Sequence, residues 1–225
     1  ITLSANSIDE NSSGADIGEL TTSDVDVGDT HTYSLTGTDA SSFEVVDGKL
    51  KLKSGVSGDY ENKSSYSVTI TSTDVAGVAV SQSFTISIND INEAPTAISL
   101  SASAIDENTT AAVVGTLTAT DPDASDTVTL ELSGTDADSF EIVEGKLQLK
   151  SDVSADYEVQ TSYSITVTAT DAGGLTTTQD FTVNVNNLND NTPEISSDAT
   201  FSMAENTNVV GTITGSDADG DTLTY

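Results

Sequence analysis

Acidic side chains recur at five places along this chain of 225 residues, and their chemistry suggests cation binding. The first place is a glutamate in an early I-D-E-N pattern, and the second is a D-Y-E tripeptide. The others are a D-x-D triplet, a later T-D pair and a linker rich in Asn and Asp. Carboxylate and amide oxygens in this number suit a hard cation such as Ca²⁺, which takes about six to eight oxygen ligands.

The motifs return in the same order along the chain. The acidic members are Glu10, Glu107 and Glu205; Asp59 with Glu61 and Asp156 with Glu158; Asp24 with Asp26, Asp121 with Asp123 and Asp217 with Asp219; and Asp74 and Asp171, while the linkers are residues 89–95 and 187–193. One isolated D-x-D is usually a solvated turn, because Asp favours turns. Five motifs that keep their order in each complete copy favour metal ligation instead.

Two other uses of these carboxylates are disfavoured. An EF-hand needs glycine at loop position six and glutamate at position twelve, but counting from Asp24 gives Asp29 and Leu35, and the count from Asp121 also fails. Paired carboxylates could hydrolyse glycosides, but every acidic cluster here repeats and none is unique. The sequence therefore predicts that the chain is not an enzyme.

The acidic motifs belong to an internal repeat. "SSFEVVDGKLKLKS" at 41–54 returns as "DSFEIVEGKLQLKS" at 138–151, and the offset between the first two glutamates is 107 − 10 = 97 residues. A third copy begins with "TFSMAEN" at 200–206. We expect repeats at 1–94 and 95–192 and the incomplete start of a third at 193–225.

Strand patterns must position the acids. "YSVTITS" at 66–72 places Tyr66, Val68 and Ile70 on one face and mainly hydroxyl side chains on the other. This period of two is typical of a half-buried strand, and no window has the 3.6-residue period of a helix. About seven such strands per unit predict an all-β fold of tandem Greek-key seven-stranded β-sandwiches, of the type found in immunoglobulin-like domains, end to end.

The composition limits the possible partners. The chain has 37 acidic and 6 basic residues, a formal net charge of −31, and no cysteine. Such a charge repels nucleic acid and anionic membranes, and the absence of cysteine excludes disulfides and thiolate metal sites. No apolar run is long enough for direct membrane insertion, and the expectation is that these residues include no signal peptide, as in an internal or mature piece of a secreted protein. Cations are the expected counter-ions.

The ordered set of Glu, D-Y-E, D-x-D, T-D and Asn/Asp linker resembles the cadherin repeat, in its bacterial-type tandem form. The resemblance covers the whole chain, because all five motifs occur in order in both complete units, and it implies about three Ca²⁺ ions at each inter-domain junction. It implies ligands at the first junction from Glu10, Asp59, Glu61, Ile91, Asn92, Glu93, Ala94, Asp121, Asp123 and Asp171. At the second it implies Glu107, Asp156, Glu158, Leu188, Asn189, Asp190, Asn191, Asp217 and Asp219.

Three further acids have no preceding unit in this sequence. Asp24, Asp26 and Asp74 match the D-x-D and T-D positions, so they are expected to take part in a site with an earlier repeat. Ile91, Ala94, Leu188 and Asn191 would contribute backbone carbonyl oxygens. The first linker departs from the family's D-x-N-D-N pattern, because Glu93 and Ala94 replace Asp and Asn.

The first junction gathers seven carboxylates, and three Ca²⁺ ions would make that cluster nearly neutral. Without metal, like charges would push the two domains apart. The Asn/Asp linker is therefore interpreted as a hinge that calcium converts into a rod.

These features predict a calcium-rigidified segment of a large extracellular adhesin or surface fibre protein, secreted or at the cell surface. Its partners would be neighbouring repeats and other copies of the chain, as in homophilic cell adhesion. The alternative is a polysaccharide-binding module, which needs an exposed aromatic platform, whereas aromatic residues make up 5% of the chain. Strand exchange anchored by tryptophan is excluded because the chain has none.

Four other residues carry smaller expectations. His31 is expected on a strand surface, and Tyr60 and Tyr157 are expected to pack under the junctions. Tyr225 matches Tyr33 of the first repeat. The sequence is therefore expected to be a window on a longer array, with its third repeat completed either by the same chain or by strands from another chain.

Overall fold

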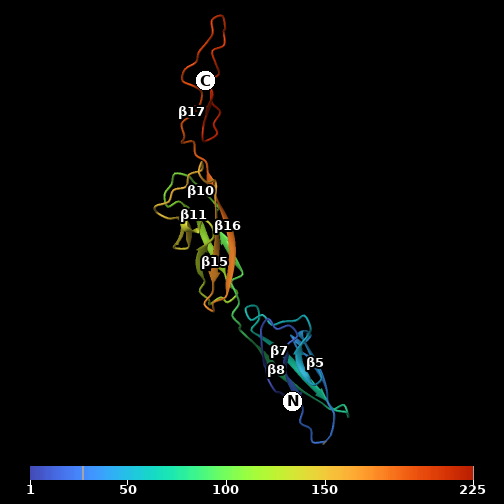
Figure 1. The fold of residues 1–225 in the computed structure, drawn as a ribbon. Helices are drawn as coiled ribbons and strands as arrows, with labels where there is room; N and C mark the ends of the chain where they lie inside the picture. Colours follow the sequence, from blue (N-terminus) through green and yellow to red (C-terminus); the bar gives the residue numbers. More distant parts are fainter. Residues whose placement is uncertain (27, 225) are drawn as a thin grey trace. The chain divides into compact units, whose positions relative to one another are not determined.

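The computed structural model describes residues 1–26 and 28–224 (Figure 1). Two compact units divide the chain, Ile1–Glu93 and Ala94–Tyr225, and each is described by itself. Within the described residues, regular structure consists of strands and two short 3₁₀ turns, Ala40–Ser42 and Ala137–Ser139. Tyr225 lies outside these residues.

The first unit contains two four-stranded sheets. Their strands are β1 (Thr2–Leu3), β2 (Ser7–Asp9), β3 (Asp16–Thr21), β4 (Thr32–Thr36), β5 (Phe43–Val46), β6 (Lys49–Leu52), β7 (Ser65–Thr73) and β8 (Ala79–Asn89). One sheet has the order β1-β3-β6-β5, and the other has the order β2-β8-β7-β4. All pairs are antiparallel except β2 with β8, which is parallel.

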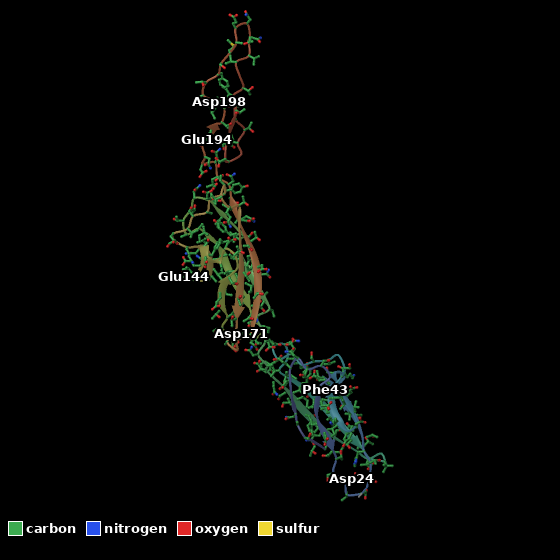
Figure 2. The ribbon with its side chains drawn as sticks, in the orientation of Figure 1. Asp24, Phe43, Glu144, Asp171, Glu194 and Asp198 are labelled. Carbon is green, nitrogen blue, oxygen red and sulfur yellow. The ribbon has the colours of Figure 1, made fainter. Side chains whose placement is uncertain are left out.

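The two sheets of the first unit bury one aliphatic core between them. Leu50 and Leu52 of β6 pack in the same cluster as Val68 and Ile70 of β7. The predicted alternation holds along β7, where Ser67 lies on the exposed side. Phe43 meets the edge of the Tyr66 ring, with centroids 5.6 Å apart, and Figure 2 shows Phe43 inside this unit.

The second unit repeats the arrangement at its beginning. Its strands are β9 (Ala97–Leu100), β10 (Ala104–Asp106), β11 (Val113–Thr120), β12 (Thr129–Ser133), β13 (Phe140–Val143), β14 (Lys146–Leu149), β15 (Ser162–Thr170) and β16 (Thr176–Asn186). The sheet orders are β13-β14-β11-β9 and β10-β16-β15-β12. Figure 1 shows β15 and β16 side by side through most of this part. The all-β sandwich fold is confirmed.

Each complete sandwich has eight strand segments where seven strands were expected, because its first strand is divided between the sheets. β1 pairs with β3, and β2 then pairs with β8 on the other side of the core. Gly18 allows the crossing, because a Cβ atom there would lie 2.8 Å from the backbone N and O atoms of Ala5. Gly115 lies equally close to the backbone N atom of Ala102 in the second unit.

The last part of the second unit has little regular structure. β17 (Glu194–Ile195) pairs with β18 (Gly215–Ser216), and together they form a two-stranded sheet. In Figure 1 the chain between them forms an extended loop beyond β17. A two-stranded sheet is marginal by itself, because it cannot bury a hydrophobic face.

Candidate metal centre

A buried glutamate anchors the start of each linker to its own repeat. Glu10 is 3% exposed and accepts hydrogen bonds from the backbone N–H groups of Tyr60 (2.7 Å) and Ile91 (2.8 Å). Each bond goes to a different carboxylate oxygen. An ionised carboxylate has about four lone-pair sites, so acceptor capacity remains for a cation.

The second repeat reproduces this arrangement. Glu107 is 1% exposed and accepts the N–H groups of Tyr157 (2.7 Å) and Leu188 (2.6 Å). The glutamate therefore joins three segments of each sandwich: the early strand, the D-Y-E turn and the linker. The first residues of the linker are held by these bonds before any metal is considered.

Further carboxylates gather beside each anchoring glutamate. In the first unit, oxygens of Glu10, Glu61 and Asp90 lie within 4.8 Å of one another. In the second unit, oxygens of Glu107 and Glu158 form a similar group with Asp190. The D-Y-E aspartates stand apart from these groups of three.

The D-Y-E aspartates Asp59 and Asp156 close local turns. Their carboxylates accept the backbone N–H groups of Asn62 (2.8 Å) and Val159 (3.0 Å). Each therefore shapes the turn that presents the neighbouring glutamate, and each retains free acceptor sites on its carboxylate.

Desolvation and neighbouring like charges raise the pKa of both D-Y-E glutamates. A hydrogen bond from its own backbone N–H lowers the pKa of Glu61, but desolvation and the charges of Glu10 and Glu93 outweigh it and raise that pKa above its ordinary value. Desolvation is the main cause that raises the pKa of Glu158, and the charges of Glu107, Asp219 and Asp190 add to it. A divalent cation would relieve this repulsion.

The D-x-D and T-D carboxylates of the second repeat lie at its other end, where Figure 2 labels Asp171. Asp123 and Asp171 are both buried, with 8% and 6% exposure. Asp121 accepts the N–H of Asp123 (3.0 Å), and Asp171 accepts the N–H of Leu175 (2.8 Å). These turns hold three carboxylates at one end of the sandwich.

Two buried oxygens at this end support cation binding. The Oδ2 atoms of Asp121 and Asp126 are inaccessible to solvent and accept no hydrogen bond within the described part of the chain. Both residues line a hollow of about 400 Å³, together with Asp123. A buried ionised oxygen without a partner is costly, so this all-oxygen donor set fits a hard cation such as Ca²⁺.

The same end of the first repeat carries a related cluster, near Asp24 in Figure 2. Carboxylate oxygens of Asp24, Asp29 and Asp74 lie within 4.8 Å of one another. Asp26 is not part of this group, but its N–H bonds to Asp24 (3.0 Å). That bond, and then the side chain of His31, lower the pKa of Asp24.

His31 does not lie on a strand surface as expected. It precedes β4 and is partly buried, and its Nε2 atom lies 3.1 Å from Asp24 Oδ2. The carboxylate cluster draws the imidazole inward, so the side chain is a partner of this cluster. In the second repeat Val128 occupies the equivalent position.

Asn191 and Asp219 connect the second linker to the last segment within the second unit. Asp219 Oδ2 accepts the N–H of Asn191 (2.8 Å), and its Oδ1 accepts Nδ2 of Asn191 (3.1 Å). The Asn191 side chain is the main cause that lowers the pKa of Asp219. Asp217 accepts the N–H of Asp219 (3.0 Å), and Asn189 donates to Asp221.

Not all expected ligands make comparable contacts. The side chains of Ile91 and Leu188 are 44% and 40% exposed, and their N–H groups bond to the anchoring glutamates. Asn92 bonds weakly to the carbonyl of Glu93 (3.4 Å). Ala94 begins the second unit and is partly buried.

The two D-Y-E tyrosines differ from each other. Tyr157 is partly buried against the second core, as expected, whereas Tyr60 is 38% exposed. The expectation that Tyr60 packs under its junction is therefore wrong.

Three kinds of residue at these sites were not predicted from the sequence. Asp29 and Asp126 extend the D-x-D motif to D-x-D-x-x-D, a spacing that is readable in both repeats. Asp90 joins the first cluster, although its equivalent is Asn187. The asparagine that follows each anchoring glutamate was also missed.

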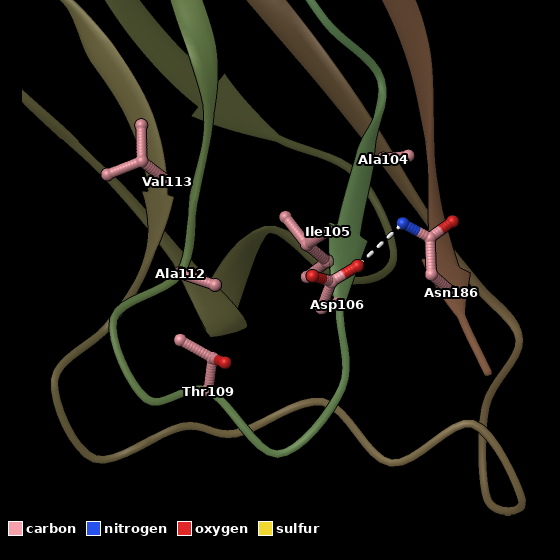
Figure 3. A pocket seen from close by; sticks show the side chains of 7 residues that line it. All are labelled: Ala104, Ile105, Asp106, Thr109, Ala112, Val113 and Asn186. Carbon is pink, nitrogen blue, oxygen red and sulfur yellow. Dashed lines mark hydrogen bonds between the residues drawn. The ribbon is translucent and has the colours of Figure 1, made fainter. Parts of the chain in front are cut away.

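One hollow near the first-strand end of the second repeat does not suit a metal. It measures about 270 Å³ and is lined mostly by small side chains, with Asp106 as its one carboxylate (Figure 3). In Figure 3 the Asp106 carboxylate accepts a hydrogen bond from Asn186 (2.8 Å). This bond fastens β10 to β16.

The second repeat is similar to a known protein domain. The cadherin-domain model matches residues 101–186. Cadherin-related family member 2 of Homo sapiens is 32% identical over 221 residues, which cover 87% of this chain and 17% of that protein. The chain thus corresponds to about a sixth of that relative's length.

Solved structures agree on the fold. Extracellular cadherin domains 3–6 of protocadherin gamma B2 match with a TM-score of 0.64 and 19% identity, covering 97% of this chain and 56% of that one. Domains EC22–24 of mouse cadherin-23 match with a TM-score of 0.62 and 22% identity, covering 97% and 75%. The cadherin-domain match also supports the prediction that the chain is not an enzyme.

Proposed function

The chain is a cadherin-like repeat protein, and on that premise we propose that it is a calcium-stiffened segment of a large extracellular surface protein. The observation that carries the proposal is the repeated cluster at the linker: Glu107, Glu158 and Asp190 in one repeat, and Glu10, Glu61 and Asp90 in the other. The same arrangement in both complete repeats argues against chance crowding of surface acids.

Calcium would act here as a structural ion. The anchoring glutamates, the D-Y-E motifs and the linkers would provide one part of each site, and the D-x-D and T-D aspartates of the next repeat would provide the rest. Bound Ca²⁺ would neutralise carboxylates that otherwise repel one another, and so restrict the linker. About three ions per junction remain the expected number.

The division into repeats at 1–94 and 95–192, with an incomplete repeat at 193–225, is part of this proposal. Stiffened repeats of this type would serve as a stalk or adhesion module at the cell surface or in a secreted fibre. Neighbouring repeats and other copies of the chain are the proposed partners. A bacterial-type adhesin remains the specific form that the sequence motifs favour.

Other features limit the alternatives. Among residues 1–26 and 28–224 there is no helix whose length and hydrophobicity would allow it to span a bilayer. A polysaccharide-binding module would need several aromatic rings on one face. Tyr60 and Phe201 are the large exposed aromatic side chains of the described residues, and they belong to different units.

Calorimetric titration with Ca²⁺ tests the proposal. The wild-type chain should bind several ions, and Glu10→Ala or Asp123→Ala should weaken part of this binding. Glu44→Ala and Glu131→Ala are matched controls, because these acids lie outside the five motifs. Equal losses from all four variants, or no heat of binding in the wild type, would contradict the proposed calcium sites.

A further inference from the structure

An asparagine with an unusual backbone follows each anchoring glutamate. Asn11 and Asn108 have φ angles of 58° and 61°, in the left-handed region that few residues other than glycine adopt. Their backbone N–H groups donate to the carbonyls of Gly58 (3.1 Å) and Ala155 (2.9 Å). This conformation turns the chain so that the asparagine side chain faces the linker.

Each asparagine side chain binds the linker carboxylate. Nδ2 of Asn108 donates to Oδ2 of Asp190 at 2.5 Å, and Nδ2 of Asn11 donates to Oε1 of Glu93. The contact therefore recurs in both repeats, although one linker offers an aspartate and the other a longer glutamate. The contact is kept although the linker residue differs between the repeats. The asparagine therefore holds the carboxylate group in the same place, whichever residue carries that group.

In the second repeat the carboxylate is held from two sides. Oδ1 of Asp190 accepts Nδ2 of Asn191 (2.7 Å), while Oδ2 accepts Asn108. Asp190 also belongs to the cluster with Glu107 and Glu158. One hydrogen bond on each oxygen leaves lone pairs for a cation and opposes rotation of the carboxylate away from its neighbours.

We propose that Asn108 and Asn11 are positioning residues, which hold the linker carboxylates Asp190 and Glu93 in the orientation that binds the cation. This inference rests on the proposed calcium function. Groups that orient a metal ligand through a hydrogen bond commonly change metal affinity about 10–100-fold when they are removed. The same contact would order the linker before the metal arrives.

A purely conformational role is the competing explanation, because asparagine tolerates positive φ better than most residues. Asn108→Gly separates the two roles, since glycine accepts this backbone conformation but has no side chain. Asn206 is a matched control. It follows Glu205 in the third copy with φ 67°, and its side chain makes no hydrogen bond within the described segments.

The experiment uses the full chain with two readouts. Calcium titration should show about a 10–100-fold loss of affinity at one class of site in Asn108→Gly, and no change in Asn206→Gly. In chelator, the backbone amides of residues 189–191 should exchange with solvent several-fold faster in Asn108→Gly, while the exchange of β15 and β16 stays as in the wild type.

The outcomes are distinct. If Asn108→Gly binds calcium as tightly as the wild type, the positioning role is overturned while the proposed function stands, even if the linker amides exchange faster. If the wild type itself binds no calcium, the proposed function fails and the positioning role fails with it. General acceleration of exchange through β15 and β16 would show a structural defect and would also overturn the assignment.

Discussion

The two complete repeats share the order and pairing of their strands but fill part of their cores differently. Gly58 faces Ile88, and a Cβ atom at Gly58 would come within 2.9 Å of the isoleucine side chain. The second repeat has Ala155 and Val185 at these places, 97 residues further on. The second repeat has one carbon more at the glycine position and one carbon fewer at the isoleucine position. The volume of the contact is therefore nearly unchanged, as dense core packing requires.

A group of three hydrogen-bonded side chains in the first repeat is replaced by three apolar side chains in the second. In the first repeat, the hydroxyl of Thr22 contacts Tyr33 Oη (3.2 Å) and Ser72 Oγ (2.8 Å), and Ser72 is buried. In the second repeat the three equivalents are Ala119, Leu130 and Ala169. Removing all members together avoids an unpaired buried hydroxyl.

By contrast, the residues that hold the linker are the same in both repeats. Both repeats keep the buried glutamate and the asparagine after it, Glu10 with Asn11 and Glu107 with Asn108. These repeats therefore tolerate exchanges inside the sandwich when volume and hydrogen bonding are balanced. The residues that fix the linker do not vary in this way.

The largest expected effect comes from removing the anchoring glutamate. Glu107→Ala would leave the partly buried N–H groups of Tyr157 and Leu188 without their acceptor, and an unpaired N–H group costs up to about 1–3 kcal/mol when it is shielded from water. Relief of charge repulsion offsets part of this, so we expect a loss of about 2 kcal/mol in chelator. Denaturant unfolding should give the same loss for Glu10→Ala.

Glu131→Ala is the matched control for this prediction, because Glu131 is exposed on β12. It should change the free energy of unfolding by less than about 0.5 kcal/mol. If Glu10→Ala and Glu107→Ala differed widely, the two anchors would not be equivalent.

The crossing glycines should give the next effect. Gly18→Ala and Gly115→Ala each place a methyl group against backbone atoms, and overpacking of this type costs about 1–3 kcal/mol. Gly58→Ala is the comparison, because it meets a side chain that can shift. Thermal unfolding should therefore rank Gly58→Ala as the mildest of the three, and the reverse order would contradict this account of the crossing.

Exchanging the core pair Gly58 and Ile88 tests whether the two positions compensate for each other in volume. Ile88→Val alone should cost about 0.5–1.5 kcal/mol because it removes a buried methyl group. Combining it with Gly58→Ala reproduces the pair of the second repeat and should recover most of that loss. A double-mutant cycle measures the coupling, and strictly additive effects would show that the two positions do not compensate.

The smallest effect concerns pH. The raised pKa of Glu158 means that the folded, metal-free protein holds this proton at a higher pH than the unfolded chain does. The stabilisation that Glu158 gives through this raised pKa is therefore present at low pH, and it is lost as pH rises through the folded-state pKa. Melting in chelator should occur at a slightly higher temperature at pH 5 than at pH 7.

Glu158→Gln should remove this rise, because glutamine does not titrate. With excess calcium the trend should reverse, since protons compete with the metal for carboxylate oxygens. An unchanged pH dependence in Glu158→Gln would assign the effect to other groups.

Much of the sandwich was predictable from the sequence, because alternation records which side of a strand meets the core. Tyr66, Val68 and Ile70 show this on β7. The division of the first strand was less readable, because its cause is the close approach of Gly18 to Ala5, a contact between separate segments. The inward turn of His31 likewise depends on a carboxylate seven residues away.

The third copy shows where sequence pattern stops determining burial. Met203, Val210 and Ile213 match Ile105, Val114 and Leu117 of the second repeat. The second-repeat residues are at most 4% exposed, whereas their counterparts are 50–55% exposed. The strands that cover the second-repeat residues, such as β14 and β15, have no third copy in this sequence, so the same apolar pattern has no core to join.

At the candidate metal centre, the sequence predicted the residue types better than their contacts. Glu10, Glu61 and Asp190 lie in clusters of carboxylates. The places of Asp90 and Asp126 at these sites were recognised only from the folded structure. The asparagine contacts were also hidden, because they span about 80 residues of sequence.

Small-angle X-ray scattering of the full chain, in millimolar Ca²⁺ and then in chelator, tests the central claim most directly. If calcium stiffens the linkers, the distance distribution of the calcium-bound chain should extend to the long distances of a rod, and chelation should shift it toward shorter distances as the repeats begin to move independently. Identical distributions in calcium and in chelator, under conditions where calorimetry shows calcium bound, would contradict the account.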